Sequence, residues 1–302
     1  MRQPESSRNF RGKVITLFLL GVLAASTSFG APQDSVPNNT ARCFPVFDAT
    51  LFTNKPDLTT AGLQKITLVD PDRWLSPGQT RGQIPADSSI KSALQTSMTS
   101  AVLVLDSEDW PLQGTSGAIG DATNNYLTLL SRVRQTGVQG LVGYYGAPPI
   151  RDYWRAIGPP SSQNYLAWQA ENNLLQPLAN AVDVLFPSIY TFYNDQAGWT
   201  KYAIANLSEA RRLAGGKPVY AFIWPQFHDS NKTLGLQHIP GEFWALQLRT
   251  VAQYADGVVI WGGWKVKWDE QAEWWQATRQ FMLTAPQICR NPSAPSDLRA
   301  HP

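Results

Sequence analysis

Short runs of apolar residues recur along the chain, and polar or turn-forming residues bound each of them. Seven runs have the length and the aliphatic and aromatic content of buried strands. They predict strands at residues 44–49, 65–70, 101–106, 140–145, 183–190, 218–224 and 257–262.

Segments with apolar residues at helical spacing lie between these strands. One begins with an acidic cap at Asp87, one ends at Gly137, and one has Pro240 at a first-turn position, all of them ordinary helix boundaries. The pattern predicts helices at residues 87–99, 121–137, 162–181, 198–216, 240–257 and 269–282.

This alternation predicts the fold class. Apolar strands separated by helices favour a parallel sheet that is covered on both faces. Seven such units within residues 43–289 fit a TIM-like (β/α)7 barrel that forms a single domain. A doubly wound sheet is the alternative, but a glycine-rich phosphate loop should then follow the first strand, and "FDATLFTNK" contains none.

The N-terminus predicts export. Basic residues precede the apolar run "VITLFLLGVLAAS" and small residues follow it, which is typical of a secretory signal peptide, here residues 1–30. The run is shorter than the roughly 20 residues of a membrane span, although an uncleaved anchor stays an alternative. We expect a secreted protein, or a periplasmic one in a bacterium, with no membrane contact after cleavage. Polar, proline-containing stretches predict a linker at residues 31–42 and a disordered tail at residues 290–302.

Composition narrows the possible partners. The net charge is +2, but residues 1–30 carry four basic side chains and one acid, which leaves about −1 for the rest. This part lacks the basic surplus of nucleic-acid-binding proteins. The histidines have no metal-site spacing and no GxSxG motif accompanies them. We expect a monomer with no metal, no cofactor and no nucleic-acid partner.

The chain has two cysteines, Cys43 and Cys289, near the two ends of the predicted barrel. In an oxidising compartment such a pair predicts a disulfide. Two free buried thiols are the alternative.

The third predicted strand ends in the acidic sequence "LDSEDW". Active sites of parallel barrels lie at the carboxyl ends of the strands. Side chains alternate along a strand, so Asp106 and Glu108 point to one side and Ser107 to the other. If the two acids face the barrel interior, burial and mutual repulsion raise the pKa of one of them, as general-acid catalysis requires. A solvated acidic turn is the alternative.

Aromatic residues end the strands that follow. Their faces can stack on pyranose rings, while a carboxylic acid can protonate a glycosidic oxygen. We therefore predict a carbohydrate site, although Tyr190 could instead belong to the core. The candidate aromatic residues are Trp110, Tyr144, Tyr145, Tyr190, Trp224 and Trp261.

Four segments, "LDSEDW", "GYYGAPP", "LFPSIY" and "GVVIWGGW", resemble motifs of the hyaluronidase family of glycoside hydrolases in order and spacing. The resemblance covers residues 43–289 and implies a divergent member. That family folds as a seven-stranded barrel and joins a cysteine before the first strand to one after the last. The resemblance therefore implies the same barrel and a Cys43–Cys289 disulfide.

The resemblance also implies a mechanism and residue roles. Glu108 matches the general acid/base, and Asp106 matches the carboxylate that orients the 2-acetamido group of the substrate. The carbonyl oxygen of that group attacks the anomeric carbon, so the enzyme supplies no nucleophile. Tyr190 matches the tyrosine that hydrogen-bonds near the acetamido group, and Trp261 matches the tryptophan that walls its pocket.

Three departures from the family pattern leave alternatives open. Ser107 and Asp70 stand where the family has aromatic residues, and Phe222 replaces a tyrosine of the substrate-binding surface. We expect hydrolysis of an N-acetylhexosaminyl linkage in hyaluronan, chondroitin or a neutral amino-sugar polymer. A non-catalytic carbohydrate-binding protein, or a glycosidase whose own nucleophile is Asp70 or Asp195, are the alternatives.

Overall fold

The computed structural model describes residues 43–75 and 78–285. The predicted signal peptide, linker, tail and Cys289 lie outside these residues, so the export signal and the disulfide stay predictions. No helix in the described ranges is both long and apolar enough to cross a membrane.

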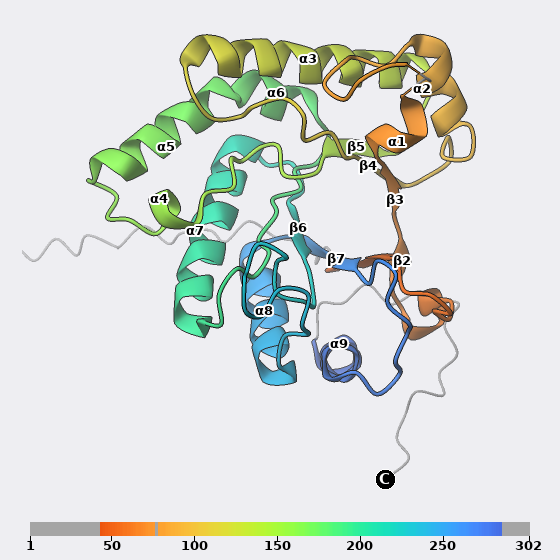
Figure 1. Ribbon diagram of the computed structural model, residues 1–302, viewed down its shortest axis with the longest axis vertical. Coiled ribbons are helices and arrows are strands. Elements are labelled where there is room, and N and C mark those ends of the chain that lie inside the picture. Colours follow the sequence, from red (N-terminus) through yellow and green to blue (C-terminus); the bar gives the residue numbers. More distant parts are fainter. Residues whose placement is uncertain (1–42, 76–77, 286–302) are drawn as a thin grey trace, which may run out of the picture. The chain divides into compact units, whose positions relative to one another are not determined.

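Parallel strands form the centre of the protein, as the sequence predicts (Figure 1). One sheet has the order β2-β1-β7-β6 and the other has the order β3-β4-β5. The strands are β1 (Val46–Thr50), β2 (Gln64–Lys65), β3 (Thr67–Val69), β4 (Val102–Leu105), β5 (Leu141–Tyr144), β6 (Tyr220–Ile223) and β7 (Gly257–Gly262).

Two short connections link these sheets. β2 and β3 are halves of one predicted strand, interrupted only at Ile66; β2 pairs with β1, and β3 pairs with β4. Residues 183–190 make isolated parallel bridges to Tyr145 on one side and to Val219 and Phe222 on the other. The pairings thus pass through seven strand positions and return to β1, which is the predicted TIM-like (β/α)7 barrel.

The fifth predicted strand is the one that differs most from expectation. Residues 183–190 form no continuous strand. Pro187 lies in their middle, and a proline cannot donate a hydrogen bond to a neighbouring strand. Its carbonyl still accepts from the Phe222 N–H at 2.9 Å, and the Ile189 N–H donates to the Phe222 carbonyl at 3.0 Å.

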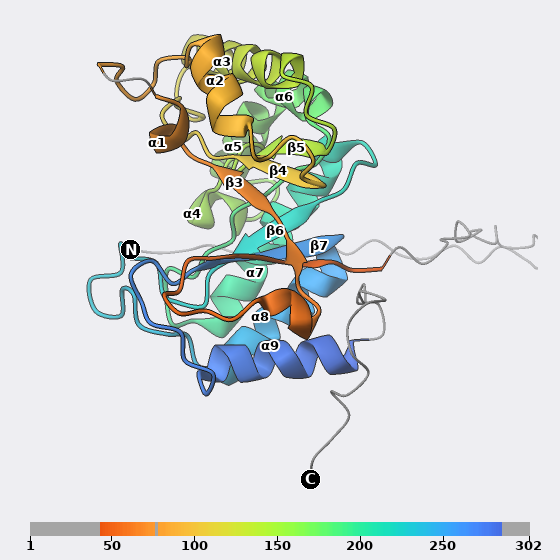
Figure 2. The same cartoon turned by 90° about the vertical axis from the view of Figure 1, so that its right-hand side faces the viewer.

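Helices flank the strands on both sides (Figure 2). The predicted helix at 121–137 begins earlier, because the Thr115 side chain caps it by accepting from the Ala118 N–H. The elements are η1 (Leu58–Ala61), α1 (Pro71–Trp74), α2 (Asp87–Leu94), α3 (Ser116–Gln135), α4 (Tyr153–Ala156), α5 (Gln163–Leu174), α6 (Gln176–Ala181), α7 (Gln196–Ala214), α8 (Gly241–Tyr254) and α9 (Glu273–Thr284).

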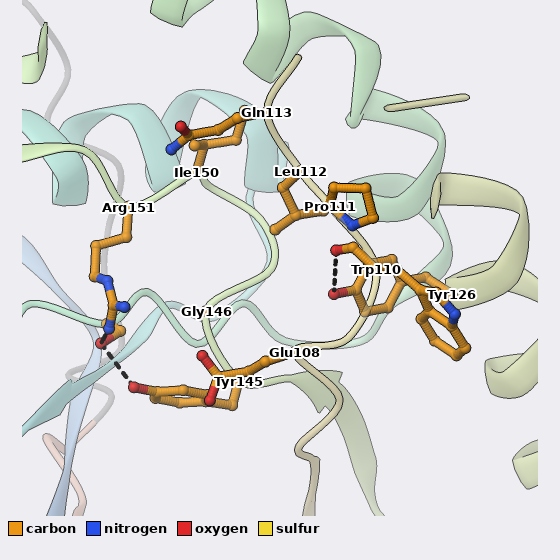
Figure 3. A pocket seen from close by; sticks show the side chains of 11 residues that line it. Glu108, Trp110, Pro111, Leu112, Gln113, Tyr126, Tyr145, Gly146, Ile150 and Arg151 are labelled. Carbon is orange, nitrogen blue, oxygen red and sulfur yellow. Dashed lines mark hydrogen bonds between the residues drawn. The ribbon is translucent and has the colours of Figure 1, made fainter. Parts of the chain in front are cut away.

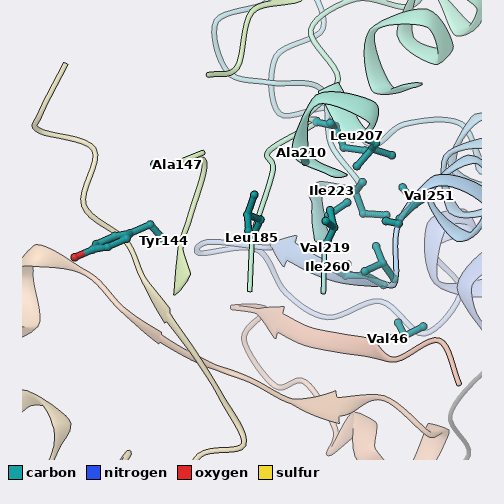
Figure 4. Packing of buried hydrophobic residues seen from close by; sticks show 14 of the residues in the cluster. Val46, Tyr144, Ala147, Leu185, Leu207, Ala210, Val219, Ile223, Val251 and Ile260 are labelled. Atoms are coloured by element: carbon teal, nitrogen blue, oxygen red, sulfur yellow. The ribbon is translucent and has the colours of Figure 1, made fainter. Parts of the chain in front are cut away.

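Side-chain alternation along the strands produces two apolar layers. On β4, Val104 belongs to the inner cluster, together with Phe186 and Val259. Its neighbours Leu103 and Leu105 belong to the outer cluster beneath the helices. In the outer layer, side chains from strand positions pack with side chains from α7 and α8 (Figure 4). The strand residues are Val46, Leu185, Val219, Ile223 and Ile260, and the helix residues are Leu207, Ala210 and Val251.

Two aspartates clamp the amino-terminal ends of adjacent strands in the same way. The Asp183 N–H donates to the Val142 carbonyl at 2.9 Å, and the Asp183 carboxylate accepts from the Val142 N–H at 3.1 Å. Asp256 makes the same pair of bonds with Val219, at 2.8 and 2.9 Å. An arginine pairs with each aspartate: Arg134 with Asp183 at 2.9 Å and Arg211 with Asp256 at 3.1 Å.

Replacing Asp183 by alanine should lower the free energy of unfolding by about 1–3 kcal/mol, because the Val142 N–H loses its acceptor. The melting temperature should fall by several degrees, measured by circular dichroism. Asp183→Asn keeps an acceptor oxygen, so its free energy of unfolding should fall by less than that of Asp183→Ala. Asp72→Ala, in an ion pair whose acid side chain is 82% exposed, should change stability by less than about 0.5 kcal/mol. Equal losses in Asp183→Ala and Asp72→Ala would contradict the clamp.

Candidate active site

Strand register brings three polar residues to one level of the barrel. Leu105 on β4 pairs with Val69 on β3 and with Tyr144 on β5. The residues that follow these three are Asp106, Asp70 and Tyr145. The Asp106 N–H donates to the Val69 carbonyl at 2.9 Å, so the ladder continues to the first acid of the pair.

Asp106 and Glu108 line the same pocket, as alternation along the strand requires. Asp106 is partly buried, whereas Glu108 is exposed. Ser107 lies between them and is only 5% exposed. Its carbonyl accepts from the Tyr126 hydroxyl on α3 at 2.8 Å, which holds the turn against the helix layer.

The pKa of Asp106 is raised from 3.8 to about 7. Burial is the largest cause, followed by the negative charges of Glu108 and Asp70; the Arg81 charge opposes them. The sequence predicts that one acid of the pair has a raised pKa, and the structure places this shift on Asp106. The reason is depth, since Asp106 is partly buried and Glu108 exposed.

Aromatic rings wall the pocket that holds the two acids, which has a volume of about 180 Å³. Tyr190 and Trp261 are stacked, with ring centroids 5.8 Å apart and planes at 21°. Trp224 meets Trp261 edge to face at 4.9 Å. Phe222 also lines this pocket and is fully buried. Tyr190 is 5% exposed and contributes both to the inner core and to this wall.

A second pocket, shown in Figure 3, has a volume of about 330 Å³ and shares lining residues with the first. Glu108, Tyr145 and Arg151 line both pockets, so the two form one cleft with Glu108 in the shared part. Trp110 lines the second pocket, and its indole N–H donates to the Gly82 carbonyl at 2.8 Å.

Tyr144 does not join the site. It is fully buried, lines neither pocket, and its hydroxyl donates to the Tyr126 carbonyl at 2.8 Å. Consecutive strand residues face opposite sides, so Tyr145 enters the cleft and Tyr144 packs under α3. The structure therefore corrects the prediction that both tyrosines contact a sugar.

The two candidate nucleophiles are helix caps. Asp195 is exposed, caps α7 through the Gly198 N–H, and lines neither pocket. Asp70 caps α1 through the Asp72 N–H at 2.9 Å and also lines neither pocket. Both carboxylates thus accept from local backbone donors, although Asp70 is close enough to Asp106 for its charge to raise the pKa of that acid.

Sequence reasoning missed Arg151 and Ser188. The Arg151 guanidinium donates to the Ser188 hydroxyl at 3.3 Å and lies 5.6 Å from the centroid of the Phe192 ring. The Tyr145 and Ser188 hydroxyls are 3.0 Å apart. Within residues 43–75 and 78–285, none of the ion pairs involves Arg151. The available signal was a basic residue in the loop after the predicted strand at residues 140–145, beyond the strand end itself.

His228 and Asp229 also line the pocket of the two acids and were likewise missed. Burial lowers the pKa of His228, the Arg151 charge lowers it further, and the Asp229 charge opposes both. The His228 Nδ1 lies 2.8 Å from the Ser230 hydroxyl. Among the residues described, no group of three or more His, Cys, Asp or Glu side chains could hold a metal ion.

Comparison with known proteins shows similarity of fold. No family model matches the chain, and no curated protein matches it. The crystal structure of bee venom hyaluronidase is similar with a TM-score of 0.55 and 15% identity, over 80% of this chain and 97% of that one. The complex of bee venom hyaluronidase with a hyaluronic acid tetramer has a TM-score of 0.51 and 16% identity, over 80% of this chain and 96% of that one. A GH18 chitinase from Pseudoalteromonas aurantia has a TM-score of 0.42 and 15% identity, over 72% of this chain and 76% of that one. The protein thus shares the barrel fold of bee venom hyaluronidase.

Proposed function

We propose that the protein is a retaining glycoside hydrolase that cleaves N-acetylhexosaminyl linkages in a polysaccharide by substrate-assisted catalysis. One observation carries the proposal: Asp106 and Glu108 share a pocket with the stacked rings of Tyr190 and Trp261. The pocket supplies an acid, a second carboxyl and flat apolar walls, which together suit a sugar ring. We also propose that residues 1–30 export the protein and that it acts as a monomer.

The reaction has two steps. In the first, Glu108 gives its proton to the glycosidic oxygen while the substrate's acetamido oxygen bonds to the anomeric carbon, so that the glycosidic bond breaks and a cyclic intermediate forms. The Asp106 carboxylate accepts a hydrogen bond from the acetamido N–H and so orients the acetamido group. In the second step, Glu108 takes a proton from a water molecule, whose oxygen bonds to the anomeric carbon. The bond between the acetamido oxygen and that carbon breaks, which restores the acetamido group. Two displacements retain the configuration.

Neighbouring side chains fit these roles. The Tyr190 hydroxyl can donate to the acetamido group, and the Trp261 ring can wall its methyl side. Since Asp70 and Asp195 already cap helices, the alternative with a nucleophile from the protein has less support. Phe222, which brings no hydroxyl, favours the second candidate, a binding protein without turnover.

The position of Arg151 in the cleft favours an acidic polysaccharide as the substrate. A guanidinium binds a planar carboxylate through two parallel hydrogen bonds. Arg151 lines both halves of the cleft, so a uronic acid next to the reacting hexosamine could reach it. Hyaluronan and chondroitin satisfy this pattern, and the bee venom complex with a hyaluronic acid tetramer makes hyaluronan the first substrate to test.

Glu108→Gln should lower kcat on the substrate by about 100- to 10,000-fold, because an amide cannot transfer the proton. The measurement is a reducing-end assay on hyaluronan, chondroitin and chitin oligomers. Glu242→Gln, at an exposed position of α8, is the matched control and should keep full activity. A thiazoline mimic of the cyclic intermediate should inhibit the wild type. Activity that survives in Glu108→Gln would refute the assigned acid, and no activity on any polymer would favour the binding protein.

The rate should fall as the pH rises above about 7. The reaction needs one proton on the pair of acids, and the raised pKa of Asp106, about 7, marks the pH above which the pair loses a proton. Asp106→Asn removes the carboxyl group that carries this pKa, so kcat should drop and the alkaline limb near pH 7 should be lost from the kcat/KM profile. Asp87→Asn, on the exposed surface of α2, should leave the profile unchanged. A wild-type profile that is flat from pH 6 to 9 would contradict this assignment.

Arg151→Gln should reduce kcat/KM on hyaluronan by about 10- to 100-fold, because the substrate carboxylate loses a charged donor. Activity on chemically carboxyl-reduced hyaluronan should change much less. An equal loss on both substrates would assign Arg151 to the support of Tyr145 and Ser188 instead of to carboxylate recognition.

A further inference from the structure

Two large aromatic side chains are exposed where the chain leaves neighbouring strand positions. Trp154 is 66% exposed and lies on α4, which follows β5; Tyr193 is 43% exposed and follows residues 183–190. Their ring centroids are 5.6 Å apart at an interplanar angle of 48°. We call this pair the rim platform. Exposing so much aromatic surface is unfavourable in water, so its position needs an explanation.

The partly buried ring of Tyr153 supports the platform. Tyr153 contacts Trp154 at 4.9 Å and Tyr193 at 5.2 Å, and it packs on the fully buried Tyr202 at 4.9 Å. The two exposed rings therefore stand on a fixed aromatic base.

Ion pairs fix the backbone that carries Trp154. Asp152 caps α4 through the Arg155 N–H at 2.8 Å, and the Arg155 guanidinium bridges Asp152 at 2.6 Å and Glu171 at 2.8 Å. All three side chains are about four-fifths buried. A platform held in this way loses little conformational entropy when a ligand stacks on it.

The platform is continuous with the cleft. The Tyr193 ring contacts Phe192 at 6.4 Å, and the Arg151 guanidinium lies over the Phe192 ring at 5.6 Å. Arg151 lines both pockets of the cleft. A chain that passes Glu108 and Arg151 therefore meets Phe192 and then the platform.

We propose that Trp154 and Tyr193 form a distal sugar-binding subsite for the same polysaccharide whose scissile bond lies at Glu108. This inference rests on the proposed function and extends it. A pyranose ring some distance from the reacting bond stacks its C–H face on the exposed indole, as aromatic faces bind apolar surfaces elsewhere. The subsite anchors long chains and leaves short oligomers, which end before the platform, unaffected.

The test measures binding of hyaluronan and chitin oligomers of about 4 and about 10 sugars by calorimetry, in a Glu108→Gln background that cannot degrade them. Trp154→Ala should weaken binding of the long oligomers by about three- to tenfold, the effect of one aromatic contact. Binding of the short ones should stay the same. Tyr193→Ala should act in the same direction, and Trp154→Tyr should keep most of the affinity.

Leu174→Ala is the matched control, because Leu174 is 40% exposed at the end of α5 and should leave both affinities unchanged. Melting temperatures of all variants identify any loss of folding. Long and short oligomers that bind Trp154→Ala and the parent equally would overturn the subsite while the proposed function stands. A parent that binds none of the oligomers would overturn both.

Discussion

The register of parallel strands is the constraint on which the site depends. Hydrogen bonds between β3, β4 and β5 align Val69, Leu105 and Tyr144, and the residues after them reach the rim together. In a parallel barrel the carboxyl ends of all strands lie on one side. The acids after β4 and the rings after later strands therefore meet there because of the strand arrangement alone. A slip of one residue would exchange the faces and would turn Asp106 toward the helices.

The same alignment has an energetic cost. Asp106 lies in a partly buried place beside Glu108 and Asp70, which raises its pKa to about 7. The folded state therefore binds this proton more tightly than the unfolded chain, and stability declines as the pH rises between about 4 and 7. Strain of this kind, an acid buried where neighbours repel it, is typical of catalytic sites.

Much of the fold was readable from the sequence, because strand and helix patterns are local. Six of the seven strand positions appear as strands, and the pair Asp106 and Glu108 follows from simple alternation. Alternation applied to "YY" would also have separated Tyr144 from Tyr145. Arg151 was not readable in this way, since it reaches the cleft from a loop, and loop paths depend on tertiary contacts such as those with Ser188 and Phe192.

The aspartate clamps at the opposite end of the barrel have a wider consequence. Asp183 and Asp256 each join a strand to its neighbour through hydrogen bonds and pair with an arginine of an outer helix. The scaffold is thus fastened at the end remote from the cleft. Segments at the cleft end of the barrel can then be exchanged or lengthened with little loss of stability in the framework.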